Sequence, residues 1–398
     1  MTTAIAEMRP GRRSRAGLAL WANIDRRLLA VMAVIAVLGL VMVMSASVSL
    51  AERQTGDAFH YFKRQLLFFG IGVALAAAVL HVRLENWQRI SMPLLIIAYL
   101  LLGLVLVPGI GREVNGAVRW IPLGVFNLQV SEVAKLLILL YLADYLVRRE
   151  EAVRSRMLAF LLPMGCIAFA GLLLLLEPDF GAAVVLAATG MGMLFLSGVP
   201  LWRFALLGGL VAAVGSLLIV ASPYRWMRLT TFIDPWQDPF ASGFQLTQSL
   251  IAIGRGEWLG VGLGGSVQKL FYLPEAHTDF LFAVFAEEFG LVGVVGLIGL
   301  YGYVVLRAFM IGSRCLRNGL PFGGYLAYGI GLWFGLQSFV NIGVNMGLLP
   351  TKGLTLPLMS YGGSSLITTL LALALLLRTS VELQLTTVSA QPLPGEYR

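Results

Sequence analysis

The chain contains 398 residues, of which 58% are hydrophobic and 13% are charged, and its formal net charge is +8. A water-soluble domain carries about twice that charged fraction, because its surface needs polar groups, so the composition excludes an ordinary soluble protein. The basic residues are scattered between apolar runs, which is typical of membrane loops and argues against a nucleic-acid-binding patch. The positions of Cys166 and Cys315 indicate neither a disulfide nor a metal site.

The first apolar stretch, residues 28–44, follows a basic segment. The arginines before it are Arg9, Arg12, Arg13, Arg15, Arg26 and Arg27. Residues 45–47, Ser-Ala-Ser, resemble a signal-peptide cleavage site, but the apolar region of a signal has about 7–15 residues and this stretch is longer. We therefore predict an uncleaved first membrane span behind a cytoplasmic basic tail, residues 1–27.

Ten apolar runs follow one another along the chain, and most have the length that a hydrocarbon core of about 30 Å requires. They fall near residues 28–48, 66–82, 90–107, 132–147, 157–176, 181–197, 202–221, 280–306, 325–347 and 364–383. The fourth and sixth are short, so one of them could be re-entrant or buried within the bundle. We predict an all-α polytopic membrane protein with a ten-span domain, residues 28–383, and a cytoplasmic tail, residues 384–398.

The distribution of lysine and arginine predicts the orientation. With the N-terminus inside, the inner segments and their flanks hold 18 of these residues, the outer segments hold 10, and Lys135 lies within a span. This asymmetry predicts that both termini are cytoplasmic. The outer segment 222–279 is unusually long, is rich in glycine and aromatic residues, and contains an amphipathic helical pattern at 244–253. Long loops of this kind are usually functional.

Asp279 ends this long outer loop and opens the next apolar helix. A carboxylate at a helix N-terminus is more often a cap than a catalyst, and there the helix dipole would lower its pKa unless burial or the substrate opposes that shift. Glu287 and Glu288 follow on the same helix, but Glu287 is about 12 Å along the axis, beyond the carboxylate separation of about 5–9.5 Å in two-carboxylate glycosidases. A single carboxylate base would suffice if the leaving group were a diphosphate, whose charge cations can stabilise. His277 is a candidate partner or a plain loop residue.

Three further segments combine polar residues with membrane helices. Glu132 and Lys135 have the i,i+3 spacing of helical neighbours, and such charges within a membrane must be paired or face a cavity. A structural pair and a pair lining a polar cavity both fit. The acidic turn at 177–181 could cap the following helix or bind a cation, and a cap is the more common role. Residues 349–365 form a glycine- and proline-rich outer segment, in which Lys352 could meet a phosphate.

Several segments, taken together and in order, resemble the SEDS family of shape, elongation, division and sporulation proteins. They are residues 115–121, 131–135, 177–181, 244–254, 262–279 and 349–365. The stretch 350–357, Pro-Thr-Lys-Gly-Leu-Thr-Leu-Pro, resembles the cell-division member of the family more than the elongation member. Val130 departs from the family pattern, which usually has proline there. The resemblance covers nearly the whole chain apart from its termini.

The resemblance implies a peptidoglycan glycosyltransferase that polymerises lipid II, a disaccharide-pentapeptide on undecaprenyl diphosphate, at the division septum of the cytoplasmic membrane. It places the family's essential aspartate on Asp279 and its membrane ion pair on Glu132 and Lys135. The substrate-binding candidates are Arg119, Lys269, Lys352, His277, Ser360 and Tyr361. Implied partners are a class B penicillin-binding protein, other division proteins and membrane lipids, with no nucleic acid. A divalent cation, Mg or Mn, is implied without an assignable ligand set, and no organic cofactor is expected.

Two other classes of function remain open on the sequence alone. A transporter or lipid flippase would also contain many helices and buried ion pairs. A scaffold that recruits a transpeptidase would need no chemistry. The position of Asp279 at one face of the membrane, rather than at its midplane, favours an enzyme over a transporter.

Overall fold

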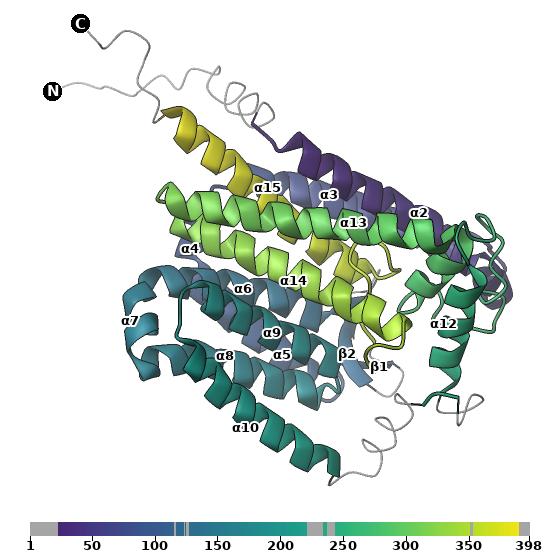
Figure 1. Ribbon diagram of the computed structural model, residues 1–398, viewed down its shortest axis with the longest axis horizontal. Coiled ribbons are helices and arrows are strands. Elements are labelled where there is room, and N and C mark those ends of the chain that lie inside the picture. Colours follow the sequence, from purple (N-terminus) through teal and green to yellow (C-terminus); the bar gives the residue numbers. More distant parts are fainter. Residues whose placement is uncertain are drawn as a thin grey trace, which may run out of the picture.

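The computed structural model is a bundle of long helices that run side by side (Figure 1). It describes residues 23–114, 117–122, 124, 127–220, 234–236, 243–350 and 353–389. Most of the predicted tail 1–27, parts of the long loop 222–279, and Lys352 therefore lie outside the described residues.

Each of the ten predicted apolar runs coincides with a helix. These helices are α2 (Arg26–Thr55), α3 (His60–His81), α5 (Ser91–Val105), α6 (Val130–Arg148), α8 (Met157–Leu176), α9 (Phe180–Leu196), α10 (Leu201–Val220), α13 (Leu281–Arg317), α14 (Pro321–Asn345) and α15 (Gly363–Ser389). Three shorter helices connect them or lie outside the bundle: α4 (Leu84–Arg89), α7 (Glu150–Ser155) and α12 (Phe244–Arg255). The amphipathic pattern at 244–253 thus correctly predicted α12.

The surface of the bundle requires lipid as its solvent. In the described residues, α2, α3, α8, α13 and α15 are long and apolar enough to span a membrane. Large apolar side chains of α3, α5, α8 and α13 point outward, among them Leu100, Leu158 and Val295. An apolar surface of this extent is not found on soluble monomers. The chain is therefore an integral membrane protein, and α15 and α6, most of whose residues are buried, form its centre.

Both terminal helices reach the same end of the bundle, because α2 begins and α15 ends there (Figure 1). This agrees with an even number of spans. Which side of the membrane that end faces stays a prediction. At the opposite end, α2, α5, α8, α10 and α14 end, and α3, α6, α9, α13 and α15 begin (Figure 1). We call this second end the Asp279 end, since Asp279 lies just before α13.

A small β-sheet at the Asp279 end was not predicted, so the all-α description is incomplete. Its strands are β1 (Arg112–Val114), β2 (Ala117–Pro122) and β3 (Asn127–Gln129), and both pairings are antiparallel. The Ser364 hydroxyl accepts a hydrogen bond from the Gln129 amide at 2.9 Å and donates one to the Asn127 carbonyl at 3.1 Å. The sheet, which connects α5 to α6, is thereby attached to the start of α15.

Helix α13 is interrupted at Gly290, whose φ of 63° and ψ of −167° are not helical. Residues 257–262 of the preceding loop pair with the backbone groups released by the break. Val261 and Gly262 donate to the carbonyls of Glu287 and Glu288, at 3.0 and 3.1 Å. Leu291 and Val292 donate back to the loop, at 2.9 and 3.1 Å. Unpaired backbone groups are costly within a membrane, so the loop and the broken helix form one unit.

The segment 353–362 also leaves helical geometry while packed inside the bundle. We expected it to be an outer loop, but residues 354, 356 and 358–360 are buried. Its backbone carbonyls find donors on distant helices. The pairs are Asn341 to Leu354, Gln337 to Thr355, Tyr301 to Pro357, and Gln65 to Ser360. Non-helical backbone is tolerated at this depth because these side chains satisfy it.

Candidate active site

Asp279 lies between the long loop and α13, but it does not cap that helix. The N-cap position of α13 is Phe280, which makes no side-chain capping bond. By contrast, Asp179 does cap α9, because its carboxylate accepts from the Ala182 amide at 3.2 Å. The capping interpretation therefore holds for the turn 177–181 and not for Asp279. The half-buried Asp279 carboxylate lies beside Gly353, where a built Cβ would be 3.2 Å from Oδ2.

The surroundings of Asp279 stabilise its protonated form, so its pKa is higher than that of a solvent-exposed aspartate. Burial raises the pKa of Asp279 from 3.8 to about 7, and the negative charges of Glu275 and Asp179 add to the increase. The positive charge of Arg119 opposes it. The helix dipole was expected to lower the pKa unless burial opposed it, and here burial and the neighbouring carboxylates do oppose it. A pKa near neutrality suits a general base.

Arg119 reaches the site from strand β2. Its guanidinium donates to the backbone carbonyls of Glu177 at 3.3 Å and Pro178 at 2.6 Å. These bonds hold β2 against the turn between α8 and α9. The side chain is half-buried, so its cationic group is held in place beside the carboxylates rather than moving freely in solvent.

Glu177 is fully buried in that turn, and neither of its carboxylate oxygens has a hydrogen-bond partner among the described residues. Burial raises its pKa to about 8, and the negative charge of Asp179 adds to the increase. A buried carboxylate without hydrogen-bond donors is costly in its charged form, so the surroundings of Glu177 favour its protonated form.

Two lysines were predicted to bind the diphosphate together with Arg119, namely Lys269 and Lys352. The described structure does not place either of them beside Asp279 with an unpaired charge. Lys269 Nζ lies 2.7 Å from the Glu288 carboxylate and donates to the Ser45 hydroxyl at 2.9 Å. Its charge is therefore already paired inside the protein. Lys352 falls outside the described residues. The part of each in substrate binding stays a prediction.

The two other glutamates considered as acid–base candidates have structural partners. Glu287 is fully buried and accepts hydrogen bonds from Ser266 and from the backbone of Val267, and Arg255 lies 3.1 Å away. Glu288 pairs with Lys269. Both carboxylates hold the long loop against α13, next to the break at Gly290.

An aromatic cluster forms beside Asp279 from three distant segments. The ring of His277 lies 4.8 Å from that of Tyr61, on α3, and 5.5 Å from that of Tyr361. The Tyr361 amide donates to the His277 carbonyl at 2.9 Å. Burial lowers the pKa of His277, so its ring is neutral, and Nδ1 has no partner among the described residues. Tyr61 was not predicted as a site residue, because the sequence around it gives no indication that it lies there.

Ser360, although it precedes Tyr361, is oriented differently. It is buried, and its hydroxyl accepts a hydrogen bond from the Leu356 amide at 2.9 Å. The hydroxyl thus stabilises the turn of segment 353–362. Of the adjacent candidates, the structure brings His277 and Tyr361 together, whereas Ser360 supports the backbone behind them.

Glu132 and Lys135 form a buried ion pair on α6, with Nζ and Oε1 2.9 Å apart. Lys135 also donates to Gln337 Oε1 on α14, at 2.9 Å, and its Nζ lies 5.2 Å from the Trp333 ring centroid. A cavity with room for about one water lies beside Lys135 and is lined mainly by apolar residues such as Leu139. The pair thus faces a packed interior.

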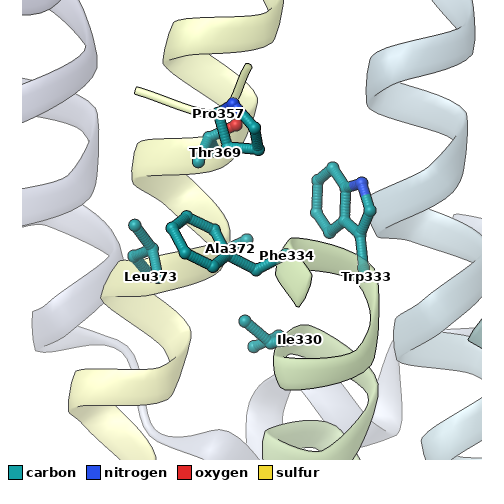
Figure 2. A pocket seen from close by; sticks show the side chains of 7 residues that line it. All are labelled: Ile330, Trp333, Phe334, Pro357, Thr369, Ala372 and Leu373. Carbon is teal, nitrogen blue, oxygen red and sulfur yellow. The ribbon is translucent and has the colours of Figure 1, made fainter. Parts of the chain in front are cut away.

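A second cavity of similar size lies between α14 and α15. Figure 2 shows the side chains that line it, with Trp333 and Phe334 on α14 opposite Ala372 and Leu373 on α15. Its lining is apolar except for Thr369. This cavity and the one beside Lys135 are thus both water-sized.

A divalent cation finds no ready ligand set in the described residues. No group of three or more histidine, cysteine, aspartate or glutamate side chains is placed there to hold a metal ion. The described residues thus offer no assignable ligand set, and the divalent cation stays a prediction.

The sequence matches the cell cycle protein family of FtsW, RodA and SpoVE over residues 25–385. A protein of Halorhodospira halophila named "Probable peptidoglycan glycosyltransferase FtsW" is 60% identical over 92% of this chain and 93% of its own length. The protein of the same name from Alkalilimnicola ehrlichii is 58% identical over 94% of this chain and 93% of its own.

Solved structures with the same fold extend the comparison. A chain of a peptidoglycan synthase complex, described as coordinating polymerization and crosslinking, has a TM-score of 0.72 and 34% identity, over 90% of this chain and 98% of that one. The rod shape determining protein RodA of Thermus thermophilus has a TM-score of 0.65 and 33% identity, over 90% of this chain and 96% of that one. The predicted resemblance is confirmed, and identity is higher to the division member than to RodA. The chain belongs to the FtsW, RodA and SpoVE family of cell cycle proteins.

Proposed function

We propose that this protein is a peptidoglycan glycosyltransferase that polymerises lipid II into glycan strands at the outer face of the cytoplasmic membrane during septal cell-wall synthesis. Relatives with 58–60% identity carry the name of this activity and span nearly all of the chain. The observation that carries the proposal for the site is Asp279, a carboxylate with a pKa near 7 that neither caps a helix nor forms an ion pair in the described structure.

In the proposed reaction, Asp279 takes the proton from the 4-hydroxyl of the incoming GlcNAc, and the hydroxyl oxygen bonds to the anomeric carbon of the growing strand. The bond from that carbon to undecaprenyl diphosphate breaks, and the diphosphate leaves with the electron pair. Attack opposite an α-linked diphosphate inverts the centre and gives a β-linkage. The leaving group needs no proton, so one carboxylate suffices.

Arg119 is the cation that we assign to the diphosphate, because its guanidinium is held beside the carboxylates. Guanidinium groups bind phosphate oxygens in bidentate geometry. Lys352 is a second candidate, next to Gly353. The lipid tails would remain in grooves between helices, so the substrate need not leave the membrane.

We further propose a class B penicillin-binding protein as the main partner, together with other division proteins. The support is the structural similarity to a chain of a peptidoglycan synthase complex. The two cavities described above hold about one water each, so neither of them offers a path for lipid.

The test uses the purified full chain with its transpeptidase partner and labelled lipid II. Asp279→Asn keeps the side-chain shape and removes the base, so we expect normal membrane insertion and partner binding with no glycan product. The matched control is Asp57→Asn, which removes a carboxylate from an exposed ion pair with Lys63. Glycan synthesis by Asp279→Asn at the control's rate would exclude the assigned base. Translocation of lipid II without any polymer from the unaltered protein would instead indicate a flippase, and neither activity would indicate a scaffold.

A further inference from the structure

Three amide side chains form a row on one face of α14. Gln337, Asn341 and Asn345 are spaced four residues apart, so they lie above one another on the helix. They are 1%, 3% and 0% exposed. Asparagine is a poor helix former, and an apolar side chain would be less costly in the core of a membrane bundle. Packing alone therefore does not explain why three amide side chains are buried on this face of α14.

Asn341 and Asn345 both bond to the backbone of Asp279. Asn341 Nδ2 donates to the Asp279 carbonyl at 2.9 Å, and Asn345 Nδ2 donates to the same oxygen at 3.0 Å. Asn345 Oδ1 also accepts from the Ala283 amide at 3.2 Å, in the first turn of α13. Asn345 thus accepts the helix-capping hydrogen bond that the Phe280 side chain cannot accept. In addition, the Asp279 carbonyl oxygen is held to α14 by two amide donors.

The same row holds the segment that faces the Asp279 carboxylate. Asn341 Nδ2 donates to the Leu354 carbonyl at 2.5 Å, and Gln337 Nε2 donates to the Thr355 carbonyl at 3.0 Å. The adjacent Gly353 is the residue whose Cβ position lies 3.2 Å from Asp279 Oδ2. The two backbone segments on either side of the carboxylate are therefore held by neighbouring amides on one rigid helix.

The row is connected to the buried ion pair on α6. Gln337 Oε1 accepts from Lys135 Nζ at 2.9 Å and from Trp333 Nε1 at 2.8 Å. With two donors on Oε1, the amide is oriented so that Nε2 points at the Thr355 carbonyl. A continuous set of hydrogen bonds thus runs from Glu132 through Lys135 and Gln337 to the site.

We infer that Asn341 and Asn345 are positioning residues for Asp279, and that the Glu132–Lys135 pair supports the site by orienting Gln337. This inference rests on the proposed function, because it assumes that the Asp279 carboxylate is the base. The side chains of Asn341 and Asn345 bond only to backbone atoms, so they act through Asp279 and segment 353–362. A base displaced by about 1 Å can lose about 100-fold in rate.

The test is the rate of lipid II polymerisation by Asn341→Ala and Asn345→Ala as a function of pH and substrate concentration. Without its amide donors, the loop is expected to loosen and admit water to Asp279. We expect kcat to fall about 10- to 100-fold with KM within about twofold. The midpoint of the acid limb should move below that of the unaltered protein. The charged groups that face Asp279, namely Glu275, Asp179 and Arg119, are unchanged in these variants, so they would not cause that movement.

The matched control is Ser338→Ala, a residue of the same helix that is 3% exposed and donates only to the Phe334 carbonyl within its own helix. It should keep both kcat and the acid midpoint. If the asparagine variants cannot be purified folded, Gln337→Ala, which leaves both bonds to the Asp279 carbonyl intact, should show the smaller loss of kcat and a shift of the same sign.

Two results would overturn the inference. One is an unchanged kcat and acid midpoint in folded asparagine or Gln337 variants. The other is a lower yield or unfolding temperature with an unmoved midpoint, which would mean that the amides are structural only. The proposed function fails separately, since it requires that Asp279→Asn makes no glycan. If Asp279→Asn is inactive and the amide variants are normal, only the positioning role is wrong.

Discussion

Replacing Lys135 by methionine should strongly destabilise the bundle. Lys135 and Glu132 are 2% and 3% exposed, so almost no solvent screens their interaction. Methionine keeps the length of the lysine stem, so the change removes mainly the charge and the donors. Glu132 then loses its cation, and its second oxygen already has no partner among the described residues. Removing one member of a buried pair costs about 3–5 kcal/mol.

The double variant, with Glu132→Leu added to Lys135→Met, provides the comparison. Both buried charges are then absent, and apolar replacements of buried pairs are often neutral or stabilising. We expect the double variant to unfold within about 1–2 kcal/mol of the unaltered protein. Because each single change costs about 3–5 kcal/mol, the coupling energy of the cycle should then be at least about 4 kcal/mol. The double variant should still polymerise poorly, because Gln337 has lost the lysine donor that orients it.

The measurement is reversible unfolding of the purified chain in mixed micelles, titrated with a denaturing detergent and followed by helix content. An exposed-pair variant, Lys63→Met, should change the unfolding free energy by less than about 1 kcal/mol. If both Lys135→Met and Glu132→Leu lost no more than this control, the pair would contribute little to the fold. If the double variant polymerised at the normal rate, the connection through Gln337 would be wrong.

Three other predictions concern Asp279, Gly353 and the orientation of the chain in the membrane. Burial raises the pKa of Asp279 in the folded state, so its ionisation lowers the free energy of unfolding as pH rises from about 4 to 8. Asp279→Asn does not ionise, so its stability relative to the unaltered protein should increase over that range, with an upper limit of about 4 kcal/mol. A constant difference in unfolding free energy across this range would contradict it. Gly353→Ala places a methyl group 3.2 Å from the carboxylate, so kcat for lipid II should fall about tenfold with little change in thermal unfolding; an unaltered kcat would count against it. Without the native cysteines, Tyr272→Cys should react with an impermeant thiol reagent in intact spheroplasts and Arg314→Cys only after lysis, and the reverse pattern would invert the orientation.

The sequence was sufficient for the helices because each depends on local composition. A run of about 20 apolar residues has few alternatives in a membrane protein, and every predicted run coincides with a helix. The i,i+3 spacing of Glu132 and Lys135 likewise placed them side by side. The position of Asp279 before an apolar helix was also evident from the order of residues.

The features that were missed depend on contacts between distant segments. The strands β1–β3 are three to six residues long and lie in a loop without a strong alternating pattern. The break at Gly290 is stabilised by a loop about 30 residues earlier, and a glycine within an apolar helix is not by itself a break signal. Tyr61 and Asn341 reach the site from helices whose sequences show no sign of it. The raised pKa of Asp279 follows from burial, which local sequence does not reveal.

The depth of segment 353–362 within the bundle explains why the polar residues around it are so numerous. A backbone that leaves the helix in a membrane exposes carbonyls that neither water nor the next turn can satisfy, so donors must come from neighbouring helices. Asn341 supplies one of these donors, and the same amide also holds the Asp279 carbonyl. Satisfying the backbone and placing the carboxylate are thus two consequences of one contact. Replacing Asn341 perturbs both together, whereas Asp279→Asn removes the base and leaves every backbone bond in place. The comparison of these two variants therefore separates the chemistry of the site from its support.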